Sequence, residues 1–209
     1  MLVEQRQENQ TQRFSYSAFS LDMVRQRFTI EIHLQRFFAD IPRVDATELL
    51  RASLARASTV ALLSEKARSE FIVAPILLEL KEILENRVSI YSGIRLDVAP
   101  LEGLQGICDF IVSKAPPLPI LQAPLIMMVE AKKNDIEEGL GQCAAEMVAA
   151  QRFNQGEGKQ SLAVYGCVTT GELWQFLKLS ASLLQIDPEK IYIEHIDKIL
   201  GMLMKMAAG

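Results

Sequence analysis

One apolar stretch decides the fold and most of the functional interpretation: LIMMVEAKK, residues 125–133. It is typical of a buried β-strand that ends abruptly in Glu-x-Lys. Because side chains alternate along a strand, Glu130 and Lys132 share one face and lie about 6–7 Å apart along it. A carboxylate and an ammonium placed together at the end of a buried strand can hold a metal ion and act on a water molecule beside it. The plainer alternative is a buried strand that simply emerges into solvent.

A second acid lies inside an apolar stretch further upstream, GICDFIV, residues 106–112. In a strand, Asp109 shares its face with Ile107 and Ile111. An unpaired buried carboxylate is costly, so Asp109 needs a cation, a metal ion or several hydrogen-bond donors. The alternative is a partly exposed strand end or a structural salt bridge.

A long helix is predicted over residues 64–85, with an apolar stripe that includes Val73. Glu70 falls on this stripe, and glutamate is rarely buried without a partner. Pro75 lies within the helix and should kink it or break it near Ala74. Such a kink would, as the alternative, leave Glu70 in solvent.

The remaining segments alternate between strand and helix patterns in a simple order. Strands are predicted over residues 88–98, 104–112, 125–132, 162–168 and 173–179, with a short one over 190–194. Further helices are predicted over 20–32, 47–63, 134–153 and 196–206. From residue 64 onward the order is therefore helix, three strands, helix, and one or two strands.

The acids and this order of elements resemble the PD-(D/E)xK nuclease superfamily, which has the restriction-endonuclease-like fold. The resemblance covers roughly residues 64–179. It implies an α/β fold with an αβββαβ core, in which helices flank a mixed sheet. Residues 64–209 would form this domain, after a Gln-rich disordered segment over 1–15 and a helical N-terminal extension over 16–63. Cys108 stands where the name of the motif has proline, a position at which the family varies.

The resemblance also implies a reaction, a metal ion and a set of site residues. Asp109, Glu130 and Glu70 would bind Mg²⁺, for which Mn²⁺ can substitute. These three acids together with Lys132 would form the catalytic set. Gln142, on the helix after the strand, is a marginal member, because a solvated helix face explains it equally well. The reaction would be hydrolysis of phosphodiester bonds, in DNA rather than RNA.

Two alternatives to a nuclease remain open. The same fold could lack catalysis and act as a binding or scaffolding module. The net charge of −4 favours this alternative somewhat, since dedicated nucleic-acid binders are usually basic. In the other alternative the similarity is accidental, and the acids are ordinary surface groups of an α/β protein. A homodimer is compatible with all three interpretations.

Composition indicates a cytoplasmic protein without a membrane segment. Hydrophobic residues make up 49% of the 209, which is enough for one domain with a substantial core. No apolar run reaches the roughly 18–20 residues of a membrane helix, and residues 1–12 lack the apolar core of a signal peptide. Cys108, Cys143 and Cys167 lack the paired spacing of a zinc site, so we expect buried free thiols.

Overall fold

A mixed eight-stranded β-sheet organises the residues that the computed structural model describes, which are 14–159 and 163–209. The strands are β1 (Glu31–Leu34), β2 (Ser89–Arg95), β3 (Ile107–Ser113), β4 (Leu125–Ala131), β5 (Val164–Thr169), β6 (Leu173–Ser180), β7 (Leu183–Ile186) and β8 (Ile191–Tyr192). They lie in the order β1-β7-β6-β5-β4-β3-β2, and β8 pairs with β6. β4 runs parallel to β5, and β1 runs parallel to β7, whereas the other pairs are antiparallel. The predicted α/β class with a mixed sheet is confirmed.

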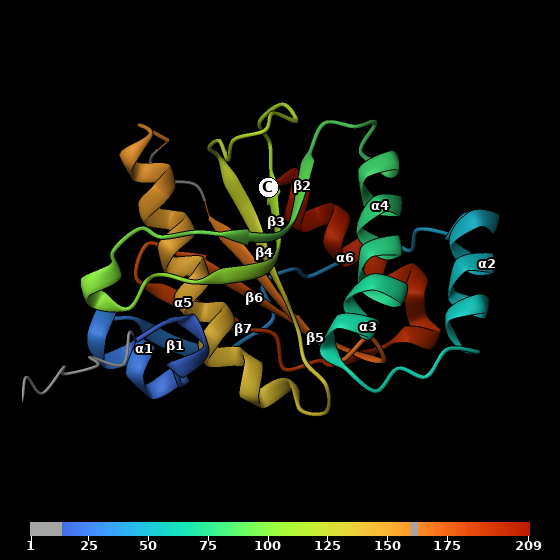
Figure 1. Cartoon of the computed structure of the whole chain (residues 1–209), viewed down its shortest axis with the longest axis horizontal. Helices are drawn as coiled ribbons and strands as arrows, with labels where there is room; N and C mark the ends of the chain where they lie inside the picture. The colour runs from blue at the N-terminus through green and yellow to red at the C-terminus, as the bar shows by residue number, and fades with distance from the viewer. Residues whose placement is uncertain (1–13, 160–162) are drawn as a thin grey trace, which may run out of the picture.

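Helices cover both faces of this sheet (Figure 1). They are α1 (Leu21–Phe28), α2 (Glu48–Ala57), α3 (Glu65–Arg68), α4 (Ala74–Ile83), α5 (Ile136–Gly156) and α6 (Ile196–Ala208). Shorter helical turns are η1 (Tyr16–Ala18), η2 (Ser69–Val73), η3 (Pro100–Glu102) and η4 (Ile193–His195). α1 and α5 lie on one side of the sheet, and α2, α4 and α6 on the other. Because both faces are covered, a central strand such as β4 is buried along its whole length.

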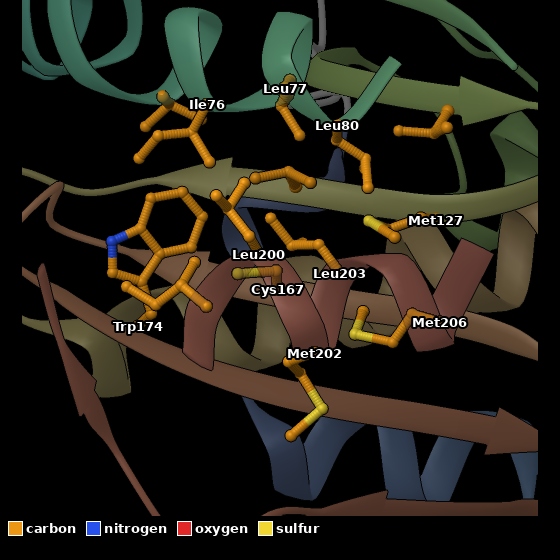
Figure 2. Packing of buried hydrophobic residues seen from close by; sticks show 14 of the residues in the cluster. Ile76, Leu77, Leu80, Met127, Cys167, Trp174, Leu200, Met202, Leu203 and Met206 are labelled. Atoms are coloured by element: carbon orange, nitrogen blue, oxygen red, sulfur yellow. The ribbon is translucent and has the colours of Figure 1, made fainter. Parts of the chain in front are cut away.

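The core on the α4 and α6 side packs Trp174 together with aliphatic and sulfur-containing side chains (Figure 2). Ile76 of α4, Leu200 of α6 and Trp174 of β6 are fully buried there. The indole N–H of Trp174 donates to the carbonyl of Gly171 at 3.1 Å, so its polar end is satisfied. Full burial of one such side chain stabilises the fold by roughly 1.5–3 kcal/mol, and this layer therefore anchors both helices to the sheet.

The long helix predicted over residues 64–85 continues through Pro75. Helical backbone runs from α3 through η2 into α4, so the expected break near Ala74 does not occur. η2 is a π turn, in which the amide of Ala74 donates to the carbonyl of Ser69, one residue further back than in an α-helix. In a regular α-helix the ring of Pro75 would collide with the carbonyl four residues earlier. The wider turn directly before Pro75 gives the ring room.

The helix predicted over residues 20–32 is wrong at its C-terminal end. α1 ends at Phe28, because Thr29 adopts the left-handed backbone conformation with φ of 55°. The chain then extends as β1, which pairs in parallel with β7. β7, which pairs with both β1 and β6, has no counterpart among the predicted strands, because four residues are too few to show a clear strand pattern. Residues 16–63 therefore contribute a strand to the sheet as well as helices.

The remaining expectations concern the chain start, α5 and the cysteines. Residues 1–13, most of the segment predicted to be disordered, lie outside the described residues, and the Phe14 ring packs edge-on against Phe19 at 4.7 Å. α5 is the helix predicted over residues 134–153, with Asp135 as its N-cap. All three cysteines are buried free thiols, as predicted. No helix in the described part of the chain has the length and apolar character needed to cross a bilayer.

Candidate active site

The two strand carboxylates lie opposite each other at one end of β3 and β4. The register pairs Phe110 with Val129, and the next pair outward is Asp109 with Glu130. Directly opposed residues of an antiparallel pair point to the same face of the sheet. Asp109 also accepts a hydrogen bond through Oδ2 from the amide of Ala131 at 2.8 Å. The structure therefore brings Asp109 and Glu130 together on neighbouring strands.

Lys132 belongs to the same cluster. Its Nζ lies 2.7 Å from Oε1 of Glu130, and the two side chains are only 14% and 3% exposed. The alternative of a strand that merely emerges into solvent is therefore wrong. Gly139 of α5 makes room for this arrangement, because a Cβ there would lie 2.5 Å from Val168 and 3.0 Å from Cγ of Lys132. A larger residue at this position would push α5 away from the site.

Gln142 of α5 contacts Lys132 directly. Its Oε1 accepts a hydrogen bond from Nζ of Lys132 at 2.9 Å, and the residue is 8% exposed. A solvated helix face, the alternative for Gln142, is wrong. The helical wheel is ambiguous here because α5 is buried on nearly every side, so its apolar stripe does not mark a single inner face.

Glu146 is a buried member of the cluster that sequence reasoning missed. Gln142 donates through Nε2 to Oε1 of Glu146 at 3.1 Å, and Glu146 is completely buried. A signal for it was present in the sequence: residues 143–150 are otherwise apolar. A helix that is apolar all round is typically buried, so a glutamate inside it is a buried acid.

Electrostatics differ among the charged groups of this site. Burial and the neighbouring Asp109 raise the pKa of Glu130 to about 7, although Lys132 opposes the shift. Burial also raises the pKa of Asp109, while the Ala131 amide and Lys132 act to lower it. Burial acts to lower the pKa of Lys132, but the charge and hydrogen bond of Glu130 raise it above its ordinary value. The pKa values of both Asp109 and Glu130 are therefore raised, and a bound cation would lower them by favouring the charged carboxylates.

Glu70 does not lie on the buried stripe of the helix, contrary to expectation. Its side chain is 52% exposed and forms an ion pair with Lys66 at 2.8 Å. The reason is η2, because a π turn at residues 69–73 interrupts the regular period on which the helical stripe was predicted. Glu70 still borders a cleft of about 320 Å³ that Asp109 also lines.

Glu65, at the first position of α3, is a second residue that sequence reasoning missed. It lines the same cleft as Asp109 and Glu70. Glu65 is exposed, and its negative charge acts to raise the pKa of Asp109, Glu130 and Lys132, as a smaller effect than burial. The N-cap Ser64, whose side chain accepts from the Ala67 amide, sets where this helix begins. The N-cap Ser64 was the signal in the sequence that could have indicated Glu65, because it marks where the helix begins.

Gly93 of β2 leaves the cleft open beside Asp109. Ser92 pairs with Phe110 and Ile94 with Cys108, so Gly93 falls opposite Asp109 in the register. Its φ of +64° is a conformation that glycine adopts without strain. A Cβ built there would meet no atom of the described residues within 4 Å. Gly93 thus adds no side chain to the cleft that Asp109 lines.

The acids fit one hard cation better than a closed metal cage. No group of three or more His, Cys, Asp or Glu side chains within residues 14–159 and 163–209 is arranged to hold a metal ion. Mg²⁺, however, commonly takes only one or two carboxylates and completes its shell with water and substrate phosphates. Oε2 of Glu130 is buried and finds no hydrogen-bond partner among the described residues. Such an unsatisfied oxygen beside Asp109 is chemically suited to a cation.

Comparison with known proteins adds no assignment. No protein-family model matches the chain, and no curated protein matches its sequence. What the site can do therefore rests on its own geometry and electrostatics.

Proposed function

We propose that this protein is a metal-dependent nuclease with a restriction-endonuclease-like fold, which hydrolyses phosphodiester bonds in DNA rather than RNA. One observation carries the proposal: Asp109 and Glu130 face each other at the ends of adjacent strands, with Nζ of Lys132 2.7 Å from Glu130. The chain order of α3–α4, β2, β3, β4, α5 and β5 is the αβββαβ order of the PD-(D/E)xK superfamily. Asp109, Glu130 and Lys132 would supply the motif of that superfamily.

The metal ion would be Mg²⁺, with Mn²⁺ as a substitute. Asp109 and Glu130 would hold it, and we assign the helical acid to Glu65 rather than Glu70, because the charge of Glu65 acts on both strand acids while Glu70 is paired with Lys66. Bound there, the ion would lower the pKa of a water molecule and stabilise negative charge on the phosphoryl oxygens. Oxygen ligands of this kind suit hard divalent cations rather than zinc.

Lys132 would act as a fixed positive charge. Its pKa is raised by Glu130, so the side chain is protonated near neutral pH and cannot accept a proton in this state. Contacts with Glu130 and Gln142 hold the ammonium in one position. A preorganised cation in a water-poor site stabilises the negative charge that develops on a phosphoryl group. We therefore assign Lys132 to electrostatic stabilisation rather than to general-base catalysis.

The acidic cleft predicts strict dependence on a divalent cation. Glu65, Glu70 and Asp109 line it, against Lys66 as the only basic residue of its lining within the described part of the chain. Uncompensated, these carboxylates would repel the phosphates of a nucleic acid. A divalent cation between the acids and the substrate reverses that repulsion, so binding and cleavage should both require the metal.

A non-catalytic binding or scaffolding module is the second candidate. The observation that favours it is the ion pair of Lys132 with Glu130, which already gives one of the two acids a positive partner. In such a module the lysine would take the place of the metal ion. This candidate predicts that Mn²⁺ does not bind at Asp109 and Glu130.

Cleavage and metal binding, measured together, distinguish the two candidates. We expect nicking of plasmid or single-stranded DNA with Mg²⁺ or Mn²⁺, none with EDTA, and Mn²⁺ binding in calorimetry. Asp109→Asn should abolish both, while its shape and its acceptor for the Ala131 amide are retained. Asp22→Asn, a change at an exposed carboxylate of α1, is the matched control and should alter neither. Wild-type protein that neither cleaves nor binds Mn²⁺ would refute the nuclease and favour the binding module.

A further inference from the structure

A chain of three side chains leads from the candidate site into the core. Nζ of Lys132 donates to Oε1 of Gln142 at 2.9 Å, and Nε2 of Gln142 donates to Oε1 of Glu146 at 3.1 Å. Gln142 and Glu146 lie four residues apart on α5, so they are stacked on the same face of the helix. The lysine end of the chain forms an ion pair with Glu130 and is 14% exposed, whereas Glu146 at the other end is completely buried.

The two ends of the Gln142 amide are not equivalent in this chain. A lysine ammonium only donates hydrogen bonds, so it requires the oxygen of the amide. The NH₂ group must then point the opposite way, where Glu146 is the acceptor. Without an acceptor at residue 146, the buried NH₂ group would lose its hydrogen-bond partner, which costs free energy. Rotation of the amide toward water or toward Glu130 would then be favourable, because it gives the NH₂ group a new acceptor.

We propose that Glu146 is a positioning residue for the site of the proposed nuclease: it holds the amide of Gln142 so that its oxygen faces the ammonium of Lys132. Glu146 does not reach the cleft, and its effect on the reaction passes through Gln142 and Lys132. The proposal rests on the proposed function for its consequence in catalysis. The geometric link itself is a property of the protein without substrate.

The surroundings of Glu146 argue against a role in stability alone. Its Oε2 finds no hydrogen-bond partner among the described residues, and its neighbours on α5 are Ala145 and Met147. Burial raises the pKa of Glu146 well above its ordinary value, because desolvation disfavours the charged carboxylate. Replacing a poorly satisfied buried polar group with an apolar one of similar volume is often neutral or stabilising. Packing alone would therefore be served better by a methionine.

Two substitutions separate the hydrogen-bond acceptor from the acid. Glu146→Gln keeps a carbonyl oxygen for the NH₂ of Gln142 and removes the titratable group. Glu146→Met removes the acceptor at nearly constant volume, and Glu146→Ala is a second variant without an acceptor in case the first does not fold. Circular dichroism and urea unfolding establish that each variant is folded before the site is tested.

Nuclear magnetic resonance of the Lys132 side chain tests the link in the protein without metal or nucleic acid. With ¹⁵N- and ¹³C-labelled lysine, the signal of Lys132 is assigned by its loss in Lys132→Arg. We expect Nζ proton exchange in Glu146→Met to be about tenfold faster than in wild type, because Gln142 no longer holds the ammonium. Glu146→Gln should retain the wild-type signal. An unchanged Lys132 signal in both variants without an acceptor would overturn the proposal.

Cleavage kinetics then measure the consequence. Loss of a positioning partner typically costs about 10–100-fold in activity, and we expect this loss in kcat with little change in KM for Glu146→Met. Glu146→Gln should restore most of kcat. Equal loss in both variants would show that the acid itself is needed and would refute positioning through the amide. Wild-type protein without any cleavage would refute the proposed function, while the resonance comparison would still support or refute the role of Glu146.

Discussion

Two of the four Lys–Glu ion pairs among the described residues differ in how deeply they are buried. Lys132 and Glu130 are 14% and 3% exposed, whereas Lys198 and Glu189 are 23% and 32% exposed. The hydrogen bond from Lys198 lowers the pKa of Glu189. The pKa of Glu130 rises to about 7, although Lys132 likewise donates a hydrogen bond to it. The lysine stabilises the charged carboxylate in both places, but at Glu130 burial and the charge of Asp109 outweigh it.

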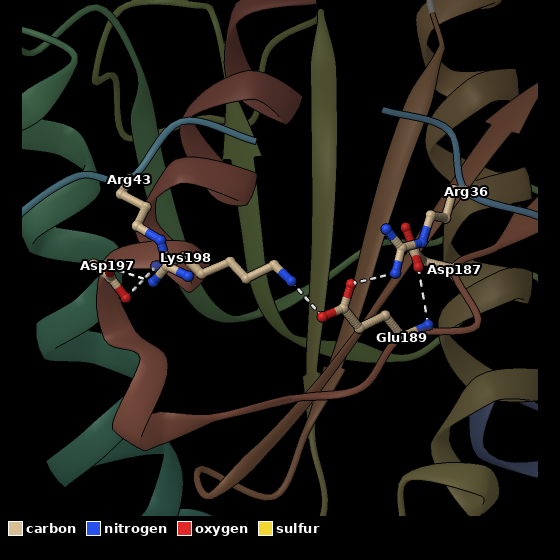
Figure 3. A network of polar contacts seen from close by, with 6 residues as sticks. All are labelled: Arg36, Arg43, Asp187, Glu189, Asp197 and Lys198. Carbon is tan, nitrogen blue, oxygen red and sulfur yellow. Dashed lines mark hydrogen bonds and ion pairs between the residues drawn. The ribbon is translucent and has the colours of Figure 1, made fainter. Parts of the chain in front are cut away.

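The difference arises from how many partners each carboxylate has. Glu189 accepts hydrogen bonds from both Lys198 and Arg36, and its own amide donates to Asp187 (Figure 3). Water also reaches it. Glu130 has one partner for Oε1 and none among the described residues for Oε2. A satisfied surface network is structural, while an unsatisfied buried pair indicates a site where another group binds.

The largest expected effect separates the two lysines by function. Lys132→Ala should reduce DNA cleavage by about 10²–10⁴-fold, because it removes a fixed electrostatic stabiliser. Lys198→Ala should leave cleavage unchanged, and Lys133→Ala controls for loss of a positive charge beside the site. The measurement is initial cleavage rate with Mg²⁺, with circular dichroism on each variant. Equal rates in wild type and Lys132→Ala would indicate a contaminating nuclease.

A second prediction separates the two glutamates by the sign of their pH dependence. The folded pKa of Glu130 lies above its ordinary value of 4.5, so folded protein binds the proton more tightly. This contribution to the free energy of unfolding is full below about pH 4.5 and is lost as the pH rises to about 7. Glu130→Gln, which imitates the protonated form, should remove the decline and be more stable at pH 8 by up to about 3 kcal/mol.

Glu189→Gln is the matched variant for this test. The pKa of Glu189 is lowered, so its contribution to stability is present at neutral pH and lost as the pH falls through the acid range. Urea unfolding between pH 3 and pH 8 measures both variants. If the two substitutions changed the pH profile in the same direction, the contrast between the pairs would be wrong.

Metal affinity provides a third and smaller effect. A metal ion requires the deprotonated carboxylate, so Mn²⁺ must displace the proton from Glu130. We expect affinity to rise by up to about tenfold per pH unit below pH 7 and to level off above it. Calorimetry from pH 5.5 to pH 8 tests this, with Glu189→Gln as the control that should follow wild type. Mn²⁺ affinity that does not change with pH would exclude Glu130 as a ligand.

The smallest effect concerns stability at the surface pair. Lys198→Ala should lower the free energy of unfolding by less than about 1 kcal/mol, since partly exposed ion pairs contribute little. The loss should shrink further in 0.5 M salt, which screens exposed charges. A loss of several kcal/mol in urea unfolding would show that the surface network is more than an ordinary ion-pair cluster.

The candidate site was predictable where the pattern is local. Alternation along one strand placed Glu130 and Lys132 on one face, and the hydrogen bond between them agrees with that placement. Glu70 was misplaced because the π turn changes the helical period within the stretch on which the stripe was counted. Glu65 and Glu146 went unnoticed. The Ser64 cap and the apolar run over residues 143–150 were signals for them, but a local pattern does not show which residues these acids face across the fold.

The sequence by itself determined the apolar strand with its Glu-x-Lys end and the α/β class. Both follow from local properties of the chain: side chains alternate between the two faces of a strand, and the apolar content of a segment is set by its own residues. The tertiary structure alone decided that Asp109 lies opposite Glu130, that β1 joins the sheet and that Glu146 supports Gln142. It also decided the pKa of Glu130. Desolvation and strand register depend on segments far apart in the chain, and only folding brings those together.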